Sequence, residues 1–326
     1  MVSASLLTFI SNLFAQLHSN SIAFGGKNVI IVGDLAQLPP VRATPVFHSS
    51  VWHLFYPLFL RQSQRQQSDP NFYKLLEEVR LGKISAHSWN LITQKASQYT
   101  QQQSLDILLT STHIVGLRET ADQINRTICN ALPIENGKLL LSKATDIIEG
   151  VQMSSEETQP EFKLKTNLPT HVRLQQGARV MFLNNSLISI GICNGTIGVV
   201  TDFDKNAESI QVAFCIRGAI IYKDITKQTQ YFYTNGQRAS RTQFPLQNSF
   251  SLTVHKTQGL TLPKVSLALD NQFFSAGQAY VALSRCPSWD QIQIQSFHKD
   301  AFITDTEVLQ QYEQLERIAS NPLPIT

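Results

Sequence analysis

Apolar residues recur at helical spacing at the start of the chain. They fall three or four residues apart, which predicts an amphipathic helix with one buried face. The residues of that face are Leu6, Ile10, Leu13 and Leu17. A second apolar pattern, an unbroken run at 29–32, ends at Gly33-Asp34. Continuous apolar runs of this length are typical of strands that are buried on both faces, so the segment predicts a strand.

The patterns that follow alternate between helix and strand. Asp69-Pro70 is an N-cap followed by proline at the first helical position, and Gly82 closes the helix that they begin. The apolar run 105–111 predicts a buried strand, and 118–132 predicts a helix. A strand followed by a helix is the repeating unit of a parallel α/β sheet.

Residues 172–248 have a different texture. Short alternations of apolar and polar residues are separated there by Asn, Gly and Asp, which is typical of a small β-barrel. The α/β pattern then returns, with a strand at 292–297 and a capping box from Thr304 to Glu307 that begins the last helix. The sequence therefore predicts an α/β fold that closes around a β-rich insert.

Composition narrows the class of protein only slightly. An apolar fraction of 42% over 326 residues is ordinary for a folded chain, and a net charge of +3 permits nucleic-acid binding without arguing for it. No apolar run approaches the roughly 18 residues of a membrane span. The cysteines are spaced too widely for a zinc site or a disulfide framework, and we expect free thiols. They are Cys129, Cys193, Cys215 and Cys286.

Asp34 stands at the end of an apolar run, where nucleotide-hydrolysing folds place a magnesium ligand. Such a ligand works beside a phosphate-binding loop, G-x-x-x-x-G-K-S/T, and no segment of the chain matches that pattern. The second acid that usually accompanies the ligand is also missing, because residue 35 is leucine. We therefore expect that Asp34 is not part of a complete metal site and that this chain supplies no metal ligands.

Three polar side chains near predicted element ends each leave two interpretations open. Gln37 lies on a turn stiffened by Pro39 and Pro40, where its amide is either a turn residue or a partner for a phosphate or an attacking water. Arg285 ends an apolar helical run. It is either a surface residue paired with the helix dipole or an arginine that reaches a transferring phosphate. Arg65 has the same two interpretations.

The segment 253–261 gathers a cation and hydroxyl groups after an apolar strand. Lys256, Thr257 and Thr261 lie close together there, and Gly259 opens the backbone. This combination suits contacts to nucleic-acid phosphates or to a nucleotide. A solvated turn is the alternative interpretation.

The order of six motifs carries more information than any one of them. They are G-D-x-x-Q-L-P-P-V (33–41), R-Q-x-x-D-P-x-F-x-x-L-L-x-x-V-R-x-G (65–82), G-A-R-V-M-F-x-x-N (177–185), N-G-T-I-G-V-V (194–200), H-K-T-Q-G-L-T-L (255–262) and Q-A-Y-V-A-L-S-R (278–285). Over nearly the whole chain, this series resembles the petite-integration-frequency DNA helicases, relatives of RecD in superfamily 1.

The resemblance implies two RecA-like domains of the P-loop NTPase type, with ATP between them and single-stranded DNA across them. Residues 1–62 would be the remnant of the first domain. Residues 63–171 and 249–326 would form the second domain, and 172–248 would be an inserted small β-barrel of the SH3-like kind. The family's phosphate loop and its Asp-Glu magnesium pair would precede the first helix. The resemblance therefore implies ATP and Mg²⁺ as cofactors, and we expect this chain to lack the phosphate loop and the acidic pair that bind them.

The resemblance also implies roles for single residues. Gln37 would sense the γ-phosphate, and Arg65 and Arg285 would complete the catalytic site. The remaining candidates divide between ATP binding, for Gln258 and Gly259, and DNA binding, for His255, Lys256, Thr257 and Thr261.

The implied function is the C-terminal portion of an ATP-dependent 5′ to 3′ DNA helicase, cut short by a truncated gene and inactive in ATP hydrolysis by itself. Its processes would be DNA replication, repair, recombination or telomere maintenance. The alternatives are a non-motor module that binds single-stranded DNA or docks onto a partner carrying the missing half, and a remnant of a transposon-encoded, Helitron-like helicase. We expect an intracellular monomer, nuclear or mitochondrial by the resemblance, with no membrane partner.

Overall fold

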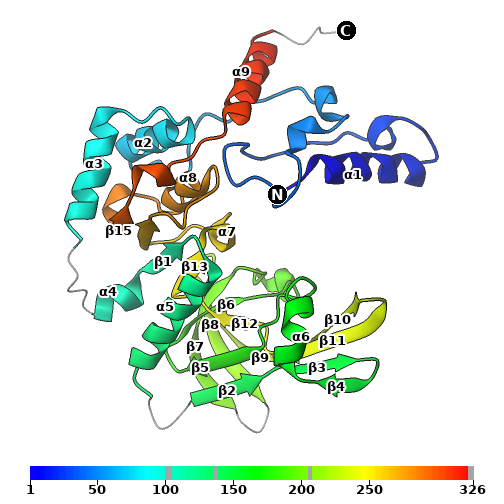
Figure 1. Cartoon of the computed structure of the whole chain (residues 1–326), viewed down its shortest axis with the longest axis vertical. Helices are drawn as coiled ribbons and strands as arrows, with labels where there is room; N and C mark the ends of the chain where they lie inside the picture. Colours follow the sequence, from blue (N-terminus) through cyan, green and yellow to red (C-terminus); the bar gives the residue numbers. More distant parts are fainter. Residues whose placement is uncertain (100–104, 135–138, 205–207, 322–326) are drawn as a thin grey trace. The chain divides into compact units, whose positions relative to one another are not determined.

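The computed structural model describes residues 1–99, 105–134, 139–204 and 208–321, and the chain divides into two compact units (Figure 1). Unit 1 comprises Met1–Gln102, Ile114–Gly116 and Thr253–Thr326. Unit 2 comprises Gln103–His113 and Leu117–Leu252. Among the helices of the described residues, none is both long and apolar enough to cross a membrane.

Unit 1 contains most of the helices. They are α1 (Ala4–Leu17), α2 (Pro70–Arg80), α3 (Ala86–Ser97), α7 (Val254–Thr257), α8 (Gln278–Leu283) and α9 (Thr306–Ser320), with short 3-10 turns at Ala23–Gly26, Val46–His48, Trp52–Leu54, Trp289–Gln291 and Lys299–Ala301. Helix α2 begins as predicted, because the side chain of Asp69 accepts a hydrogen bond from the N–H of Phe72 at 3.0 Å. Its apolar residues are buried: Phe72, Leu75, Leu76 and Val79.

A sheet of four strands runs in the order β13-β1-β14-β15. Its strands are β1 (Thr112–Val115), β13 (Ser251–Thr253), β14 (Val265–Leu269) and β15 (Ile292–Phe297). β14 and β15 pair in parallel, as the predicted α/β pattern requires. The chain crosses between the two units within β1 and β13. The predicted strand at 292–297 is confirmed.

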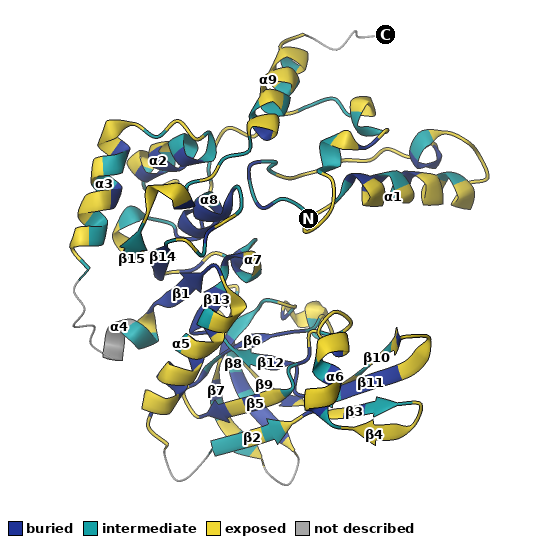
Figure 2. Ribbon diagram, in the orientation of Figure 1, coloured by how far each residue is buried: buried dark blue, intermediate teal, exposed yellow. Residues whose placement is uncertain are grey.

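The N-terminal prediction is only half right. The helix forms, but Leu6, Leu13 and Leu17 are exposed, while Ala4, Leu7 and Ser11 are the buried residues. The buried side faces the 3-10 turn at Ala23–Gly26, since the hydroxyl of Ser11 accepts a hydrogen bond from the N–H of Phe24 at 3.0 Å. The predicted leucine face has no covering element in the described residues of unit 1, and it reaches the surface (Figure 2).

Residues 29–32 do not form the predicted strand. Every residue from 28 to 33 is exposed and lies outside any helix or strand. Ile30 and Val32 keep 90% and 80% of their surface in solvent. A strand needs a neighbour to satisfy its backbone, and none of the sheets includes this segment. The apolar pattern therefore specified a buried environment that the described residues do not supply.

Unit 2 is β-rich. Its helices are α4 (Leu105–Thr110), α5 (Arg118–Ala131) and α6 (Ser155–Phe162). Its strands are β2 (Leu139–Lys143), β3 (Thr145–Ile148), β4 (Val151–Met153), β5 (His171–Gln175), β6 (Arg179–Phe182), β7 (Ile197–Asp204), β8 (Ser209–Ile216), β9 (Ala219–Thr226), β10 (Gln228–Thr234), β11 (Gln237–Gln243) and β12 (Leu246–Asn248), with a 3-10 turn at Ile188–Ile190. The sheets have the orders β12-β6-β7-β8-β9, β10-β11-β3-β4 and β2-β5.

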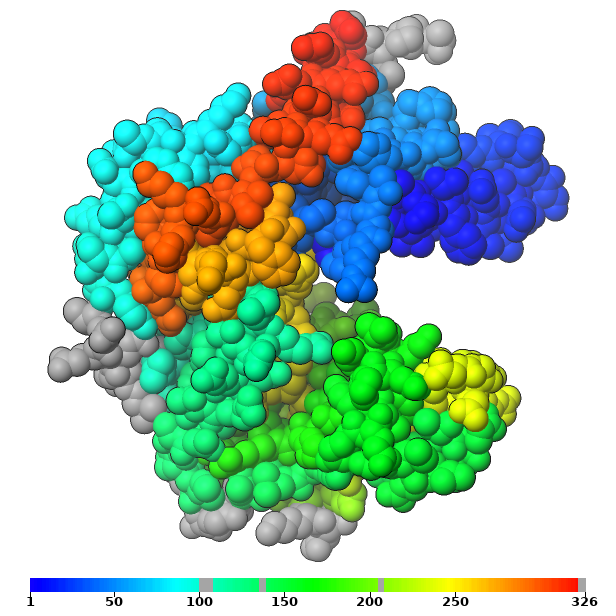
Figure 3. All heavy atoms as spheres, in the orientation of Figure 1, coloured from blue at the N-terminus to red at the C-terminus, as the bar shows by residue number. Residues whose placement is uncertain are grey.

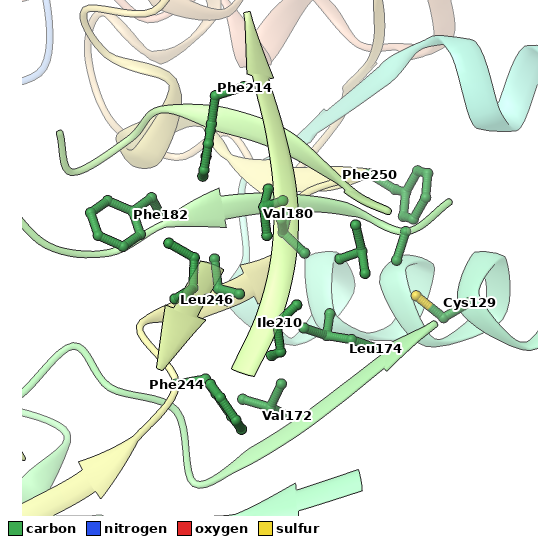
Figure 4. Close-up of a cluster of buried hydrophobic side chains, with 14 of the residues drawn as sticks. Cys129, Val172, Leu174, Val180, Phe182, Ile210, Phe214, Phe244, Leu246 and Phe250 are labelled. Carbon is green, nitrogen blue, oxygen red and sulfur yellow. The ribbon is translucent and has the colours of Figure 1, made fainter. Parts of the chain in front are cut away.

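One hydrophobic core holds the five-stranded sheet and α5 together (Figure 4). It comprises Ile128, Cys129, Leu132, Val172, Leu174, Ala178, Val180, Phe182, Ile192, Val200, Ile210, Val212, Phe214, Ile225, Phe244, Leu246 and Phe250. Phe182 and Phe214 meet edge to face at 6.2 Å between ring centroids, a favourable aromatic geometry. The predicted short strands are confirmed. Within the described residues, no ladder joins β9 back to β12, so a closed barrel is not formed by these pairings.

Two local predictions need correction. The run 105–111 was expected to be a strand, but Leu105–Thr110 is helix α4 and the strand begins at Thr112. Short apolar runs have no period that separates a buried strand from a buried helix. The last helix begins one residue later than the capping box predicted, because Asp305 is its N-cap and accepts hydrogen bonds from the N–H groups of Glu307 and Val308.

Candidate functional site

The turn that begins at Asp34 carries Gln37. The carboxylate of Asp34 accepts a hydrogen bond from the N–H of Ala36 at 3.1 Å, and its backbone carbonyl accepts one from the N–H of Gln37 at 3.2 Å. Asp favours such turns because its side chain can bond to the backbone two residues ahead. Pro39 and Pro40 then restrict the chain further. Gln37 is consequently half-buried, with its amide held in one place.

The carboxylate of Asp34 is bound by side chains from three helices. Tyr312 of α9 donates to it at 2.6 Å, Tyr280 of α8 donates at 3.0 Å, and the Arg80 guanidinium at the end of α2 lies 3.3 Å away. The carboxylate thus acts as an acceptor for tyrosine and arginine. Within the described ranges of the chain, no group of three or more His, Cys, Asp or Glu residues could hold a metal ion.

The segment 255–261 begins as the short helix α7 and turns at a glycine. Gly259 has φ of +85°, in the left-handed region that side chains disfavour. Thr257 is buried, and its hydroxyl donates to the carbonyl of Val254 at 2.8 Å. Thr261 is exposed and accepts a hydrogen bond from Arg65. Burial lowers the pKa of His255, so its imidazole is neutral at pH 7 and can hydrogen-bond without adding charge.

Arg285 and Arg65 converge on Ser284. The Arg285 side chain is 2% exposed, and its Nε and Nη2 donate to the carbonyl of Val281 at 2.8 Å and to the hydroxyl of Ser284 at 2.7 Å. Arg65 donates through Nη1 to the carbonyl of Ser284 at 2.9 Å. Burial, with the nearby charge of Arg65 as a second cause, lowers the pKa of Arg285 to about 10. Both guanidinium groups remain cationic at pH 7.

Among the residues that the structure describes, neither Arg65 nor Arg285 forms an ion pair with an acidic side chain. Buried cations are normally paired, because desolvation without a counter-charge is costly. Two neighbouring guanidinium groups that have only neutral acceptors form a site suited to an anion with several oxygens, such as a phosphate.

The predicted catalytic side chains meet through the segment 258–261. Gln258 donates its amide to Oε1 of Gln37 at 3.2 Å, and Arg65 Nε donates to Thr261 Oγ1 at 2.9 Å. Arg285 donates through Nη1 to the carbonyl of Leu260 at 3.4 Å. The structure thus brings Gln37 and both arginines to one short segment.

The cavity beside Gln37 is not shared with the two arginines. The small cavity beside Gln37, with a volume of about 20 Å³, also has Arg80, Gly277 and Tyr280 in its wall, but neither Arg65 nor Arg285. That volume is enough for about one water molecule. The contacts that join Gln37, Arg65 and Arg285 to the segment 258–261 form a hydrogen-bonded cluster.

Sequence reasoning missed the partners of Asp34. Asp34, Arg80 and Tyr280 each stand inside one of the six motifs, whereas Tyr312 stands in none of them. These motifs are distant from one another in the sequence, and no spacing rule connects positions 34, 80, 280 and 312.

Comparison with known proteins gives consistent matches. A model of the DNA helicase Pif1 2B domain matches residues 163–203, where the β-rich segment begins. The ATP-dependent DNA helicase PIF1 of Homo sapiens is 32% identical over 326 residues, which cover 97% of this chain and 48% of that protein. The ATP-dependent DNA helicase Pif1 of Bdellovibrio bacteriovorus is 27% identical, with 97% and 69% covered. The chain spans about half the length of the human relative.

Solved structures agree. The Pif1 helicase from Candida albicans matches with a TM-score of 0.80 at 25% identity, covering 97% of this chain and 75% of that one. A Pif1 helicase from Bacteroides, in complex with ADP-AlF3 and single-stranded DNA, matches with a TM-score of 0.76 at 25% identity, covering 97% and 73%. These matches confirm the mixed α/β architecture and the resemblance that the six motifs predicted.

Proposed function

The chain is related to the Pif1-type DNA helicases along nearly its whole length, and from this premise we propose that it is the C-terminal portion of an ATP-dependent 5′ to 3′ DNA helicase. The observation that carries the proposal is the meeting of Gln37, Arg65 and Arg285 at the segment 258–261. These three residues come from three motifs and are separated by up to about 250 positions. A chance arrangement would not bring all of them into contact with four consecutive residues of another motif. Replication, repair, recombination and telomere maintenance are the processes that such an enzyme would serve.

The proposed division of the chain follows the motifs. Residues 1–62 belong to a first RecA-like domain, 63–171 and 249–326 to a second, and 172–248 to the insert. The match of the 2B model to residues 163–203 supports an insert that begins near this point. The parallel pairing of β14 with β15 supports an α/β domain around it.

In the proposed mechanism, Arg65 and Arg285 bind the terminal phosphates of ATP, and Gln37 contacts the same group. Phosphoryl transfer spreads negative charge over the phosphate oxygens, and a fixed cation there lowers the barrier. Gln258 and Gly259 lie beside this group, and Gln258 already bonds Gln37. Lys256, His255 and Thr261 contact the DNA backbone, whereas Thr257, predicted from the sequence as a further contact, is buried and instead holds the segment through its hydrogen bond to Val254. The two functions therefore share one segment of seven residues.

The residues present fit a phosphate but not its magnesium ion. Two guanidinium groups without acidic partners suit phosphate oxygens, whereas the sequence contains no phosphate-binding loop and no adjacent pair of acids at a strand end. ATP with Mg²⁺ would supply the phosphoryl group, but this chain offers no ligand set for the metal. We therefore propose that the chain by itself binds single-stranded DNA and does not turn over ATP.

A non-motor role is the second candidate function. The same observation favours it, because a DNA-contacting segment without a phosphate loop can act as a binding module, either alone or docked onto a partner that carries a nucleotide-binding domain. Salt dependence tests the DNA contact common to both candidates, since each phosphate neutralised on a single strand contributes about −0.7 to the slope of log affinity against log salt concentration. A monomer remains the expected state in either case.

Lys256→Ala tests the DNA contact. We expect weaker binding to an unstructured oligodeoxythymidine, with a slope shallower by about 0.7 because one phosphate contact is lost. Fluorescence anisotropy of the labelled oligonucleotide across a salt series measures both quantities. Lys83→Ala is the matched control, because Lys83 is an exposed lysine in the turn after α2. Equal effects of the two substitutions would contradict the role of Lys256.

A further inference from the structure

Asp34 is the centre of a half-buried polar cluster that joins α2, α8 and α9. Tyr312 Oη is 2.6 Å from one carboxylate oxygen of Asp34, and Tyr280 Oη is 3.0 Å from the other. Arg80 Nε lies 3.3 and 3.4 Å from the two oxygens, and its guanidinium stacks over the Tyr312 ring at 4.5 Å. Three side chains distant in sequence are therefore fixed around one carboxylate.

The protonation states of the cluster match this geometry. Burial, followed by the charge of Asp34, raises the pKa of Tyr312 to about 12 and raises that of Tyr280 further. Both tyrosine hydroxyls therefore stay protonated and donate hydrogen bonds to Asp34. Burial alone would lower the pKa of Arg80, but the carboxylate of Asp34 raises it above its usual value. A carboxylate that accepts charge-assisted and neutral hydrogen bonds from several fixed donors holds its own backbone firmly in place.

The cluster also forms hydrogen bonds with the backbone that leads to Gln37. Tyr312 Oη accepts a hydrogen bond from the N–H of Leu35 at 2.8 Å. Asp34 accepts one from the N–H of Ala36 at 3.1 Å. From the other side, a side-chain carbon at Gly277 would lie only 2.5 Å from the carbonyl of Ala36 and 2.7 Å from that of Gln37. The turn is thus packed directly against the start of α8, whose other end leads to Arg285.

We infer that Tyr312, Tyr280 and Arg80 are positioning residues, which act through Asp34 to hold the Gln37 amide against Gln258. The inference rests on the proposed function for its consequence, because Gln258 belongs to the segment 255–261, which that proposal places beside both the phosphate and the DNA backbone. It adds a role for α9, the last helix of the described chain, which none of the six motifs includes. The hydroxyl of Tyr312 donates to the carboxylate of Asp34 and accepts from the N–H of Leu35. A substitution of Tyr312 therefore tests the inference most directly.

The first experiment measures the turn directly in the purified chain. Tyr312→Phe removes the hydroxyl and keeps the ring over Arg80. We expect the Leu35 amide to exchange its hydrogen at least about tenfold faster and the Gln258 side-chain amide resonance to shift, as seen by NMR. Tyr56→Phe is the matched control, since the Tyr56 hydroxyl also bonds α9, at the carbonyls of Ala319 and Asn321, but not Asp34. An unchanged Leu35 amide in Tyr312→Phe would overturn the inference.

The second experiment separates positioning from general stability. Tyr312→Phe should weaken binding to oligodeoxythymidine about three- to tenfold, as expected for one lost hydrogen bond, with an unchanged salt slope because no phosphate contact is removed. Gln37→Ala should weaken binding similarly, and the double variant should be no worse than Gln37→Ala alone. Additive losses, or a loss equal to that in Tyr56→Phe, would overturn the inference.

The two experiments distinguish failure of the inference from failure of the proposed function. If the unsubstituted chain does not bind single-stranded DNA, the proposed function fails, while the exchange of Leu35 still decides whether Tyr312 positions the turn. If the chain binds DNA and the Leu35 amide is indifferent to Tyr312→Phe, the inference fails and the proposed function stands.

Discussion

The N-terminal segment, residues 1–62, and unit 2 have similar apolar patterns, but unit 2 buries its apolar positions and the N-terminal segment leaves many of them exposed. In unit 2 the apolar positions of the short strands close into one core, and Phe182, Phe214 and Ile210 have no exposed surface. In the N-terminal segment, whose first residues are drawn in dark blue in Figure 3, Leu6, Leu13 and Leu17 of α1 and residues 29–32 are exposed to solvent. A segment with the apolar pattern of a buried strand forms that strand only where neighbouring elements cover it. Unit 2 supplies them from its own sequence, whereas the N-terminal segment does not.

The difference extends to backbone hydrogen bonding. β8 pairs along its whole length with β9 and, with one register shift, with β7, so its peptide groups are satisfied locally. Residues 28–33 belong to none of the sheets. Apolar side chains and unpaired backbone together make such a segment a surface that favours association with another polypeptide.

The largest expected difference concerns stability. Phe214→Ala should lower the free energy of unfolding of unit 2 by about 3–5 kcal/mol, because it leaves a cavity in a closed core. Ile30→Ala should change it by no more than about 0.5 kcal/mol, since Ile30 is 90% exposed. Hydrogen exchange of the β7 and β8 amides reports the opening of this unit. Comparable losses in the two variants would mean that the N-terminal segment is part of the same core.

A smaller effect is expected on self-association. If the purified chain departs from the expected monomer at high concentration, Ile30→Lys should reduce that association, because a charge in an extended apolar segment blocks pairing of its edge. Sedimentation velocity at several concentrations measures the change. Leu164→Lys is the matched control, since Leu164 is 82% exposed but lies in the turn after α6. If both substitutions act equally, general surface hydrophobicity rather than this segment drives the association.

The same comparison explains what could be predicted from the sequence. Helices α2 and α5 and strands β6 to β10 were predictable because their caps, periods and neighbours all lie close in the chain. Residues 29–32 and the leucine face of α1 were misplaced because burial was inferred from pattern alone, without a partner to provide it. Residues 105–111 failed because a short apolar run fits two structures.

The candidate site divides in the same way. The motifs identified Gln37, Arg65, Arg285 and the segment 255–261, and the structure brings all of these together in unit 1. The cluster around Asp34 could not be predicted, because Arg80 and Tyr312 approach Asp34 only through the packing of α2 and α9. Contacts between side chains distant in sequence depend on tertiary geometry that no local pattern encodes.

The central claim is the proposal that Arg65 and Arg285 bind a phosphate and that the segment 255–261 contacts DNA, in a sequence that contains no phosphate-binding loop. The most direct test is steady-state ATP hydrolysis by the purified chain with Mg²⁺ and enough oligodeoxythymidine to saturate the binding that anisotropy detects. We predict a rate at the background of the assay while the DNA remains bound. Turnover that rises with added DNA, and that Arg285→Ala abolishes, would contradict the claim.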